Sequence, residues 1–251
     1  MLKTSPTILI DGDIIAYRMA CAVAQGDQLD LYDGICDEIG RWTAFPGGSD
    51  GDVVICLSSG RSFRYSVYPD YKANRADQPK PALLGLANQL LREYWYCGTA
   101  EGLEGDDVMG ILANNLGDDD FVLVTIDKDL KQVPGWHWNP DKRGLPMFIN
   151  EYEALYNLHL QWLTGDATDG YAGIPGIGPK KAAKMLESFW FEDTIEAAQG
   201  HTDTIEWYAA QDADSCIREF YKIKGLYPTY CHQMFECARI LRVGMADVRI
   251  S

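Results

Sequence analysis

Short apolar runs that end in carboxylates alternate with helical segments along the first half of the chain, and this alternation most restricts its fold. The predicted strands are residues 7–11, 53–57 and 121–126, and the predicted helices are residues 14–24, 82–95 and 106–116. Strands that alternate with helices are typical of a parallel sheet covered by helices. We therefore expect an α/β fold with a central, mostly parallel sheet flanked by helices.

The second half of the chain lacks such apolar strands and has helical spacing instead. The helices predicted here are residues 151–163, 179–189, 204–223 and 230–241. We therefore expect an α/β core over residues 1–150 and a helical region over residues 151–251, packed as one compact unit. Residues 26–51 are predicted to leave the core as an excursion with a helix inside it. Residues 68–81 contain three prolines and no clear period, which indicates a mobile or crossing segment.

Composition excludes several classes of protein. The 251 residues are 47% hydrophobic, which is typical of a globular protein with a real core. No run of about 18 apolar residues is present, and the N-terminus lacks the layout of a signal peptide. The seven cysteines include no CxxC pair, which favours reduced thiols in a cytoplasm and argues against structural zinc.

Ten carboxylates fall into four short clusters. They are Asp11 and Asp13; Glu101, Glu104, Asp106 and Asp107; Asp127 and Asp129; and Asp166 and Asp169. Two clusters directly follow predicted strands, so we expect them at the same carboxyl edge of the sheet, where ligands bind in such folds. Gathered carboxylates repel one another unless cations neutralise them, and Mg²⁺ prefers oxygen ligands. Each cluster alone could be only a helix cap or a turn, but together they predict a site for two or more Mg²⁺ ions, with Mn²⁺ as a substitute.

A glycine-rich loop, Gly173 to Lys181, is the strongest single motif. Its glycines allow a phosphate to approach the backbone, Pro179 suits the first turn of the next helix, and Lys180 and Lys181 can neutralise phosphates. The alternative is a simple turn between two helices. Tyr71 to Arg75 similarly combines an aromatic ring that could stack on a base with two cations, and its alternative is an exposed loop.

The net charge of −15 argues, taken alone, against nucleic acid as a partner. Metals would neutralise part of the negative charge. The bases also gather beside the acidic motifs. They cluster at Arg61 and Arg64; at Lys72, Arg75 and Lys80; and at Lys180, Lys181 and Lys184.

These motifs resemble the 5′-nuclease (flap endonuclease) superfamily, and within it the short phage exonucleases of the T7 gene 6 type. The similarity follows the order of the family's motifs from about residue 8 to residue 242. It rests on residues 10–13, 63–64, 71–75, 103–110, 127–129, 165–170 and 238–242, together with the Gly173–Gly178 hairpin. The resemblance implies a nuclease core with a C-terminal helix-hairpin-helix-type DNA-binding region.

The resemblance also implies roles for individual residues. Metal-binding and metal-organising roles would fall to Asp11, Glu104, Asp106 and Asp127 for the first metal and to Asp127, Asp129, Asp166 and Asp169 for the second, with Asp13 and Asp107 nearby. DNA-binding roles would fall to Arg64, Tyr71, Gly173, Ile174, Gly176, Ile177, Gly178, Lys180 and Lys181. The hairpin could also bind K⁺. Lys72 and Arg75 would steer the scissile phosphate and act in catalysis with Asp11 and Asp127.

One position departs from the family pattern. The family has an aspartate just after the second strand, and this chain has Ser59 there. A hydroxyl carries no charge, so the first metal would bind more weakly unless Asp13 compensates.

We therefore predict a cytoplasmic, metal-dependent 5′→3′ exonuclease with flap endonuclease character. Its expected substrates are duplex and branched DNA and RNA–DNA hybrids, in phage replication or primer removal, and a monomer is favoured. Three alternatives stay open: a haloacid-dehalogenase-type phosphatase, a branched-DNA-binding protein with weakened catalysis, and a PIN-type nuclease that cleaves RNA.

Overall fold

The computed structural model describes residues 2, 5–23, 28–44, 52–142, 144–187, 202–242 and 248–251. The chain forms two compact units. The first combines Met1–Phe63, Gln78–Asn150 and Ile240–Ser251, and the second combines Arg64–Asp77 and Glu151–Arg239. The predicted division into a catalytic core and a DNA-binding region at residue 150 stays a prediction. The first unit also includes residues 240–251, and the second includes residues 64–77.

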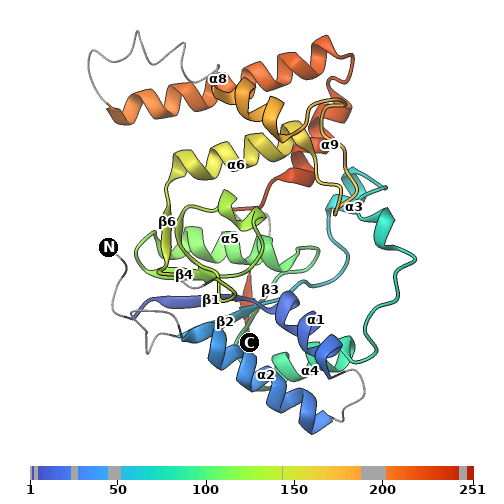
Figure 1. Ribbon diagram of the computed structural model, residues 1–251, viewed down its shortest axis with the longest axis vertical. Helices are drawn as coiled ribbons and strands as arrows, with labels where there is room; N and C mark the ends of the chain where they lie inside the picture. Colours follow the sequence, from blue (N-terminus) through green and yellow to red (C-terminus); the bar gives the residue numbers. More distant parts are fainter. Residues whose placement is uncertain are drawn as a thin grey trace. The chain divides into compact units, whose positions relative to one another are not determined.

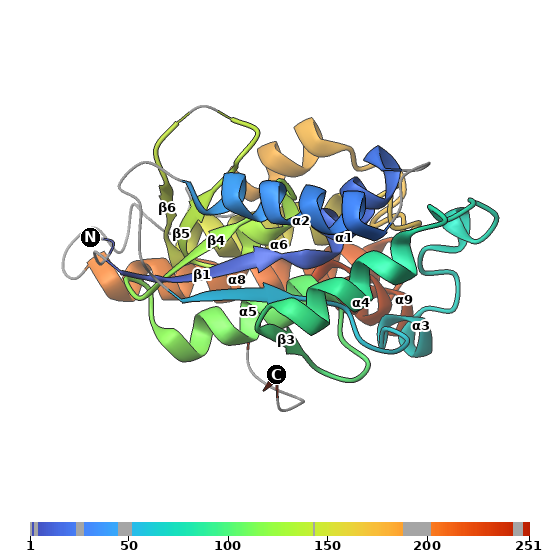
Figure 2. The ribbon, with the colours of Figure 1, turned by 90° about the horizontal axis from the view of Figure 1, so that it is seen from below.

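The first unit is built on a seven-stranded sheet with the order β6-β5-β4-β1-β2-β3-β7. Its strands are β1 (Thr7–Asp11), β2 (Val53–Cys56), β3 (Cys97–Thr99), β4 (Phe121–Val124), β5 (Gly135–Trp138), β6 (Met147–Ile149) and β7 (Arg249–Ile250). The five inner strands pair in parallel, and the edge strands β6 and β7 are antiparallel. The predicted mostly parallel sheet is confirmed. Figure 2 shows β4 and β5 on one side of the central β1.

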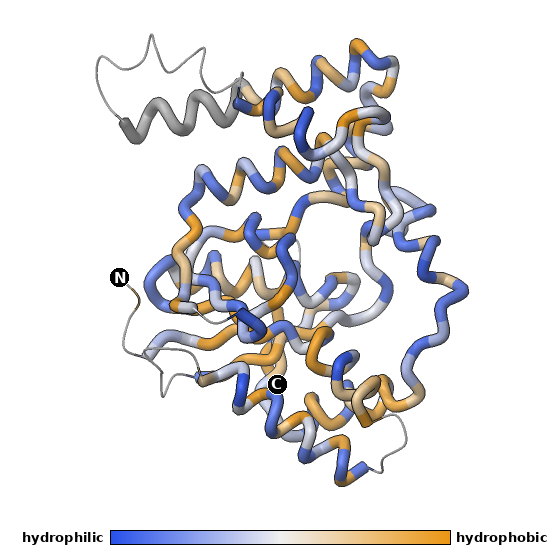
Figure 3. Tube along the Cα trace, viewed as in Figure 1, coloured by the Kyte–Doolittle hydropathy of each residue, from blue (hydrophilic) through white to orange (hydrophobic). Residues whose placement is uncertain are grey.

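Alternating side chains of the central strands supply the core on both faces of the sheet. Ile8 and Ile10 of β1 join a buried cluster with three helices on one face, and Leu9 joins a second cluster on the other. The helices on the first face are α1 (Gly12–Ala22), α2 (Gln28–Thr43) and α4 (Leu84–Tyr94), and α5 (Gly105–Leu116) covers the second. Figure 1 shows α5 on the opposite face from α2 and α4. Hydrophobic and hydrophilic residues alternate along α2 in Figure 3, as expected for a helix with one face on the core.

Sequence patterns identified three inner strands and missed four others. The missed strands β3, β6 and β7 have two or three residues each, which is too short for a period-two pattern to stand out. The missed β5 is as long as β2 and β4, but Gly135–Trp138 is not a continuous apolar run. The helix predicted within residues 26–51 is α2, and residues 45–51 lie outside the described residues.

The second unit is helical in its described residues. Its elements are α3 (Arg64–Val67), the short 3₁₀ helix η1 (Ala73–Arg75), α6 (Glu151–Thr164), a helix over residues 179–187, α8 (Thr202–Ile223) and α9 (Thr229–Ala238). Their shared core contains the fully buried Trp162, whose indole N–H donates to the Cys231 carbonyl at 3.1 Å. Of the helix predicted over residues 179–189, the last two residues lie outside the described part.

The last predicted helix, residues 230–241, ends early. It stops at Ala238 because the chain then extends and adds Ile240 and Leu241 to the core of the first unit. The Leu241 N–H donates to the Asp107 carboxylate at 3.0 Å, and the Ile240 N–H donates to the Gln132 side chain at 3.2 Å. Helical spacing of apolar residues could not reveal that these two side chains belong to another core. Among the described residues, no helix combines the length and hydrophobicity that a membrane-spanning segment requires.

Gly110 in α5 offers a test of this packing. A Cβ atom there would lie 2.3 Å from the Leu241 carbonyl oxygen, so Gly110→Ala should lower the free energy of unfolding by roughly 1–3 kcal/mol. Gly40 in α2 is the matched control, because a Cβ there has nothing within 4 Å. Gly40→Ala should instead raise the free energy of unfolding by about 0.5–1 kcal/mol. Urea unfolding measures both, and equal effects would contradict the tight contact.

Candidate metal centre and nucleic-acid-binding elements

Asp11 lies at the carboxyl end of the central strand β1 and anchors the candidate metal centre. Its side chain is buried, with 6% exposed. One carboxylate oxygen accepts the Ile14 N–H at 3.2 Å and caps α1, and the other accepts the Thr125 hydroxyl at 3.0 Å. Burial, together with the nearby Asp13 and Asp127, raises the pKa of Asp11 to about 7. Its ionised form is therefore disfavoured until positive charge is supplied.

Asp127 and Asp129 follow β4, which is the neighbour of β1. The Thr125 hydroxyl oxygen accepts the Asp127 N–H at 3.0 Å, so one threonine connects Asp11 to Asp127. The Asp127 carboxylate in turn accepts the Asp129 N–H at 2.8 Å. Asp127 is exposed and Asp129 half-buried, so both can be reached by a ligand.

Asp13 is held by Ser58, which follows β2. Its carboxylate accepts both the N–H and the hydroxyl of Ser58, and the Ser58 oxygen accepts the Gly105 N–H at 3.0 Å. Burial raises the pKa of Asp13, while the bonds from Ser58 oppose the rise. Asp13 therefore connects the end of β2 to the first turn of α5, and we interpret it as a positioning residue.

The N-terminus of α5 brings three carboxylates together. Oxygen atoms of Glu104, Asp106 and Asp107 lie within 4.8 Å of one another. Asp107 is fully buried, and its two oxygens accept the N–H groups of Leu241 and Glu104. We therefore interpret Asp107 as structural, whereas the half-buried Glu104 and Asp106 offer oxygens to a cation. Such hard oxygen donors, beside a buried acid that resists ionisation, fit a divalent cation.

Ser59 lies at the edge of this cluster. Its backbone pairs with residues 102 and 103, and its hydroxyl donates to the exposed Glu101 carboxylate at 3.3 Å. A carboxylate therefore stands beside the position where the resemblance led us to expect one.

Asp166 and Asp169 belong to the second unit and form one tight turn after α6. The backbones of Asp166 and Tyr171 exchange hydrogen bonds at 2.9 and 3.2 Å, and the Asp166 carboxylate accepts the Thr168 N–H at 2.6 Å. The Asp169 carboxylate accepts hydrogen bonds from the Arg75 guanidinium at 2.6 Å and from the Tyr71 hydroxyl at 2.8 Å. Of the nine predicted metal ligands, the seven between residues 11 and 129 thus lie in the first unit, and Asp166 and Asp169 lie in the second.

Residues 71–75 are fastened to this same turn. The Lys72 ammonium nitrogen lies 3.7 Å from a carboxylate oxygen of Asp169. The backbone N–H of Lys72 donates to the backbone carbonyl of Asp169 at 2.7 Å. Arg75 also donates to the Thr168 carbonyl at 2.9 Å. The segment predicted to be mobile or crossing therefore contains η1 and has specific partners here. Lys72 and Arg75 keep partly exposed side chains.

Two predicted DNA-binding side chains are buried instead. Tyr71 is 2% exposed, so its ring is not accessible for stacking on a base in this structure. Arg64 is 1% exposed and donates to the Arg239 carbonyl at 2.6 Å. Both side chains belong to the interior of the second unit, which a local motif could not reveal.

The Gly173–Gly178 hairpin joins α6 to the helix over residues 179–187. Ile174 and Ile177 are buried in the core of the second unit, so any contact with DNA from them must use the backbone. Gly173 has φ +58, and a Cβ there would lie 2.4 Å from the Gly165 nitrogen, which explains the need for glycine. Around Gly176 and Gly178 the space is open, and Lys180 and Lys181 are exposed.

Sequence reasoning missed two residues of the centre, Ser58 and Thr125. Each is a hydroxyl residue just past a strand end, at the edge where the aspartates were expected. A hydroxyl residue directly after an apolar strand was therefore the sequence pattern that could have identified Ser58 and Thr125.

Comparison with known proteins identifies the family. The model of the 5'-3' exonuclease N-terminal resolvase-like domain matches residues 6–138, which is more than half of the chain. The chain belongs to the 5′-3′ exonuclease family. The exonuclease of Escherichia phage T7 is 33% identical over 241 residues, covering 90% of this chain and 79% of the T7 protein. The DNA polymerase I of Rhizobium leguminosarum is 31% identical over 222 residues, but this chain corresponds to only 22% of that protein.

Solved structures confirm the fold of this 5′-3′ exonuclease family member. A T5 5'-exonuclease with bound divalent metal ions (zinc) superposes with a TM-score of 0.58 at 18% identity, covering 92% of this chain and 93% of that chain. A T5 flap endonuclease complex with DNA and metal ions gives a TM-score of 0.56 at 15% identity, covering 93% and 99%. The predicted family resemblance and nuclease-type α/β fold are thereby confirmed.

The raised pKa of Asp11 gives a pH-dependent prediction for the metal-free protein. An acid with a higher pKa in the folded state binds more protons there than in the unfolded chain, so stability falls as pH rises from about 4 to about 7. Asp11→Asn should remove this loss and make the protein more stable above pH 7 by up to roughly 4 kcal/mol. Urea unfolding in EDTA measures the difference at each pH. A difference that does not change with pH would contradict the burial of an uncompensated carboxylate.

Proposed function

We propose that this chain hydrolyses phosphodiester bonds at the 5′ ends of DNA, as a 5′→3′ exonuclease with flap endonuclease activity. The observation that carries the proposal is the gathering of carboxylates at one edge of the sheet in a member of this family. Asp11 faces the charges of Asp13 and Asp127, and Asp13 faces that of Glu104. Such a cluster needs cations, and phosphodiester cleavage uses them.

The proposed cofactor is two or more Mg²⁺ ions, with Mn²⁺ as a substitute. When bound, the cations would polarise the scissile phosphate and make water a better nucleophile. Asp11, Glu104, Asp106 and Asp127 would hold the first ion. The hydroxyls of Ser58 and Thr125 and the buried Asp107 would keep the geometry. Asp127 and Asp129 would hold or organise the second ion, and the role that the resemblance implies for Asp166 and Asp169 stays a prediction.

Substrate binding is proposed to use backbone and shape rather than base sequence. Lys72 and Arg75 would bind the phosphate near the cut and stabilise its charge. Lys180, Lys181 and the open glycines of the hairpin would bind the duplex backbone, with K⁺ at Gly173–Gly178, so affinity would fall with salt. The proposed substrates are duplex and branched DNA and RNA–DNA hybrids, the proposed state is a monomer, and the proposed location is the host cytoplasm. The T5 complex with DNA and metal ions is consistent with this proposal.

A second candidate is a branched-DNA-binding protein with weakened catalysis, and Ser59 is the observation that favours it. The phosphatase and the RNA-cleaving alternatives have no comparable support, because the family model that matches is that of a 5′-3′ exonuclease domain.

The direct test uses a 5′-labelled flap duplex and a blunt duplex with Mg²⁺ or Mn²⁺. The wild-type protein should cleave both from the 5′ end, and Asp127→Ala should lower the rate by roughly 100-fold or more, as loss of a major electrostatic contribution does. Asp118→Ala is the matched control, since Asp118 is exposed on the loop after α5 and should leave the rate unchanged. Binding without cleavage in either metal would favour the DNA-binding protein.

Ser59→Asp tests the departure from the family. An added carboxylate beside Glu101 should strengthen Mn²⁺ binding by about tenfold, a contribution of roughly 1.4 kcal/mol. Titration calorimetry without DNA measures this affinity. Ser5→Asp adds the same charge before β1, at the opposite end of the strand from Asp11, and should change little. Unaltered Mn²⁺ affinity in Ser59→Asp would show that position 59 does not face the metals.

A further inference from the structure

A pocket in the first unit lies directly beside the metal-binding acids. It has a volume of about 250 Å³ and is lined by the segment after β4, by η2 (Asp129–Gln132) and by the β5–β6 hairpin. Asp127 forms part of its wall. The volume lies just below the range of about 300–1,000 Å³ for sites that hold small organic ligands. The pocket therefore suits a ligand of about one nucleotide, next to the proposed cleavage site.

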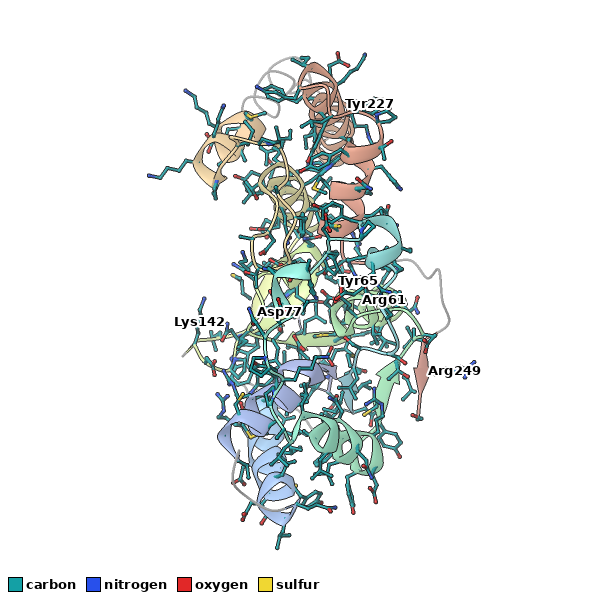
Figure 4. The ribbon with its side chains drawn as sticks, turned by 90° about the vertical axis from the view of Figure 1, so that its right-hand side faces the viewer. Arg61, Tyr65, Asp77, Lys142, Tyr227 and Arg249 are labelled. Carbon is teal, nitrogen blue, oxygen red and sulfur yellow. The ribbon has the colours of Figure 1, made fainter. Side chains whose placement is uncertain are left out.

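Three lysines give this pocket a positive character in an otherwise acidic protein. They are Lys128, Lys131 and Lys142, and all three are exposed. Lys142 lies at the surface in the loop of the hairpin (Figure 4). The buried His137 also lines the pocket, and burial and Lys131 lower its pKa to about 4, so the lysines supply the positive charge at neutral pH, beside the negative charge of Asp127. A net charge of −15 makes such a local excess of cations informative. Ammonium groups around a small cavity are suited to a phosphate.

An aromatic ring completes the lining. Trp138 ends β5, and its indole N–H donates to the Gly144 carbonyl at 3.3 Å across the hairpin. Both residues line the pocket, so this bond holds the ring in one orientation within the wall. A fixed indole beside cations is a combination that binds nucleotides, because every base has a face that can stack.

The hairpin loop is fastened to the helices on one face of the sheet. Asp141 pairs with Arg18 of α1 and with Arg41 of α2. Arg41 also donates to the Pro140 carbonyl at 2.9 Å, and Glu38 joins both arginines. This network holds residues 140 and 141, directly before Lys142, against the two helices.

We propose that this pocket binds one 5′-phosphorylated nucleotide, with its base against Trp138 and its phosphate on Lys131 and Lys142. The ligand is either the terminal nucleotide of a DNA strand or a released nucleoside 5′-monophosphate, which share this chemistry. The link between the pocket and cleavage rests on the proposed function, because Asp127 belongs to both. Nucleotide binding itself requires no metal.

Titration calorimetry in EDTA tests binding apart from cleavage, with dTMP as the probe and thymidine as its unphosphorylated partner. The wild-type protein should bind dTMP and bind thymidine more weakly. The double variant Lys131→Gln/Lys142→Gln should weaken dTMP binding by about tenfold or more, since charge-assisted hydrogen bonds to phosphate are about twice as strong as neutral ones. Lys224→Gln, an exposed lysine of the second unit, is the matched control and should bind dTMP normally. Far-UV circular dichroism checks that each variant is folded.

The ring is tested by two substitutions. Trp138→Leu should weaken dTMP binding by about fivefold or more, whereas Trp138→Phe keeps a stacking surface and should retain most of the affinity. Repeating the titration with a 5′-phosphorylated dinucleotide separates the two sources. Tighter binding of the dinucleotide supports a strand terminus, and equal or weaker binding supports the released nucleotide.

Measuring dTMP binding and flap cleavage separately distinguishes failure of this inference from failure of the proposed function. A protein that cleaves flaps but does not bind dTMP, or binds it equally well in the double variant, would overturn the pocket and leave the nuclease standing. A protein that binds dTMP through these lysines but cleaves nothing would support the pocket and overturn the proposed function.

Discussion

Mutual repulsion among carboxylates is the constraint on which the candidate centre depends. Parallel strands end at one edge of the sheet, so the acids after β1 and β4 must share a small region. The fold holds them with neutral donors: Thr125 bonds Asp11, and Ser58 bonds Asp13. Neutral donors fix the geometry without cancelling the charge. The negative potential of these two acids is therefore kept.

Much of this could be predicted from the sequence. The strands over residues 7–11 and 121–126 were visible because they are continuous and apolar, and the aspartates after them marked the ligand-binding edge. The short strand β5 was not visible, because Gly135–Trp138 mixes glycine, histidine and tryptophan. Burial was also beyond a local pattern. Tyr71 and Arg64 read as surface groups, yet both are buried by packing partners distant in sequence, such as Arg239.

The predicted acids divide into two groups with different surroundings. Asp11 and Asp13 of the first unit face other acids and neutral donors, and the pKa of Asp11 rises as a result, whereas Asp129 has the Lys128 ammonium group at 4.0 Å. Asp169 of the second unit instead has Arg75, Lys72 and Tyr71 around it. Its charge is thus balanced within its own unit. The spacing of acids in the sequence could not distinguish the two groups, because it does not show which acids have basic side chains nearby in the fold.

The packing of residues 240 and 241 into the first unit affects how the protein can fold during synthesis and where it can be truncated. Ile240 and Leu241 fill part of the core beneath α5, and the Leu241 N–H satisfies the buried Asp107. These residues can dock only after residues 1–239 have been synthesised. Until then, Asp107 would lack this partner in an apolar setting. A fragment cut at residue 150 would carry the same defect permanently, so residues 1–150 cannot simply be expressed without residues 240 and 241.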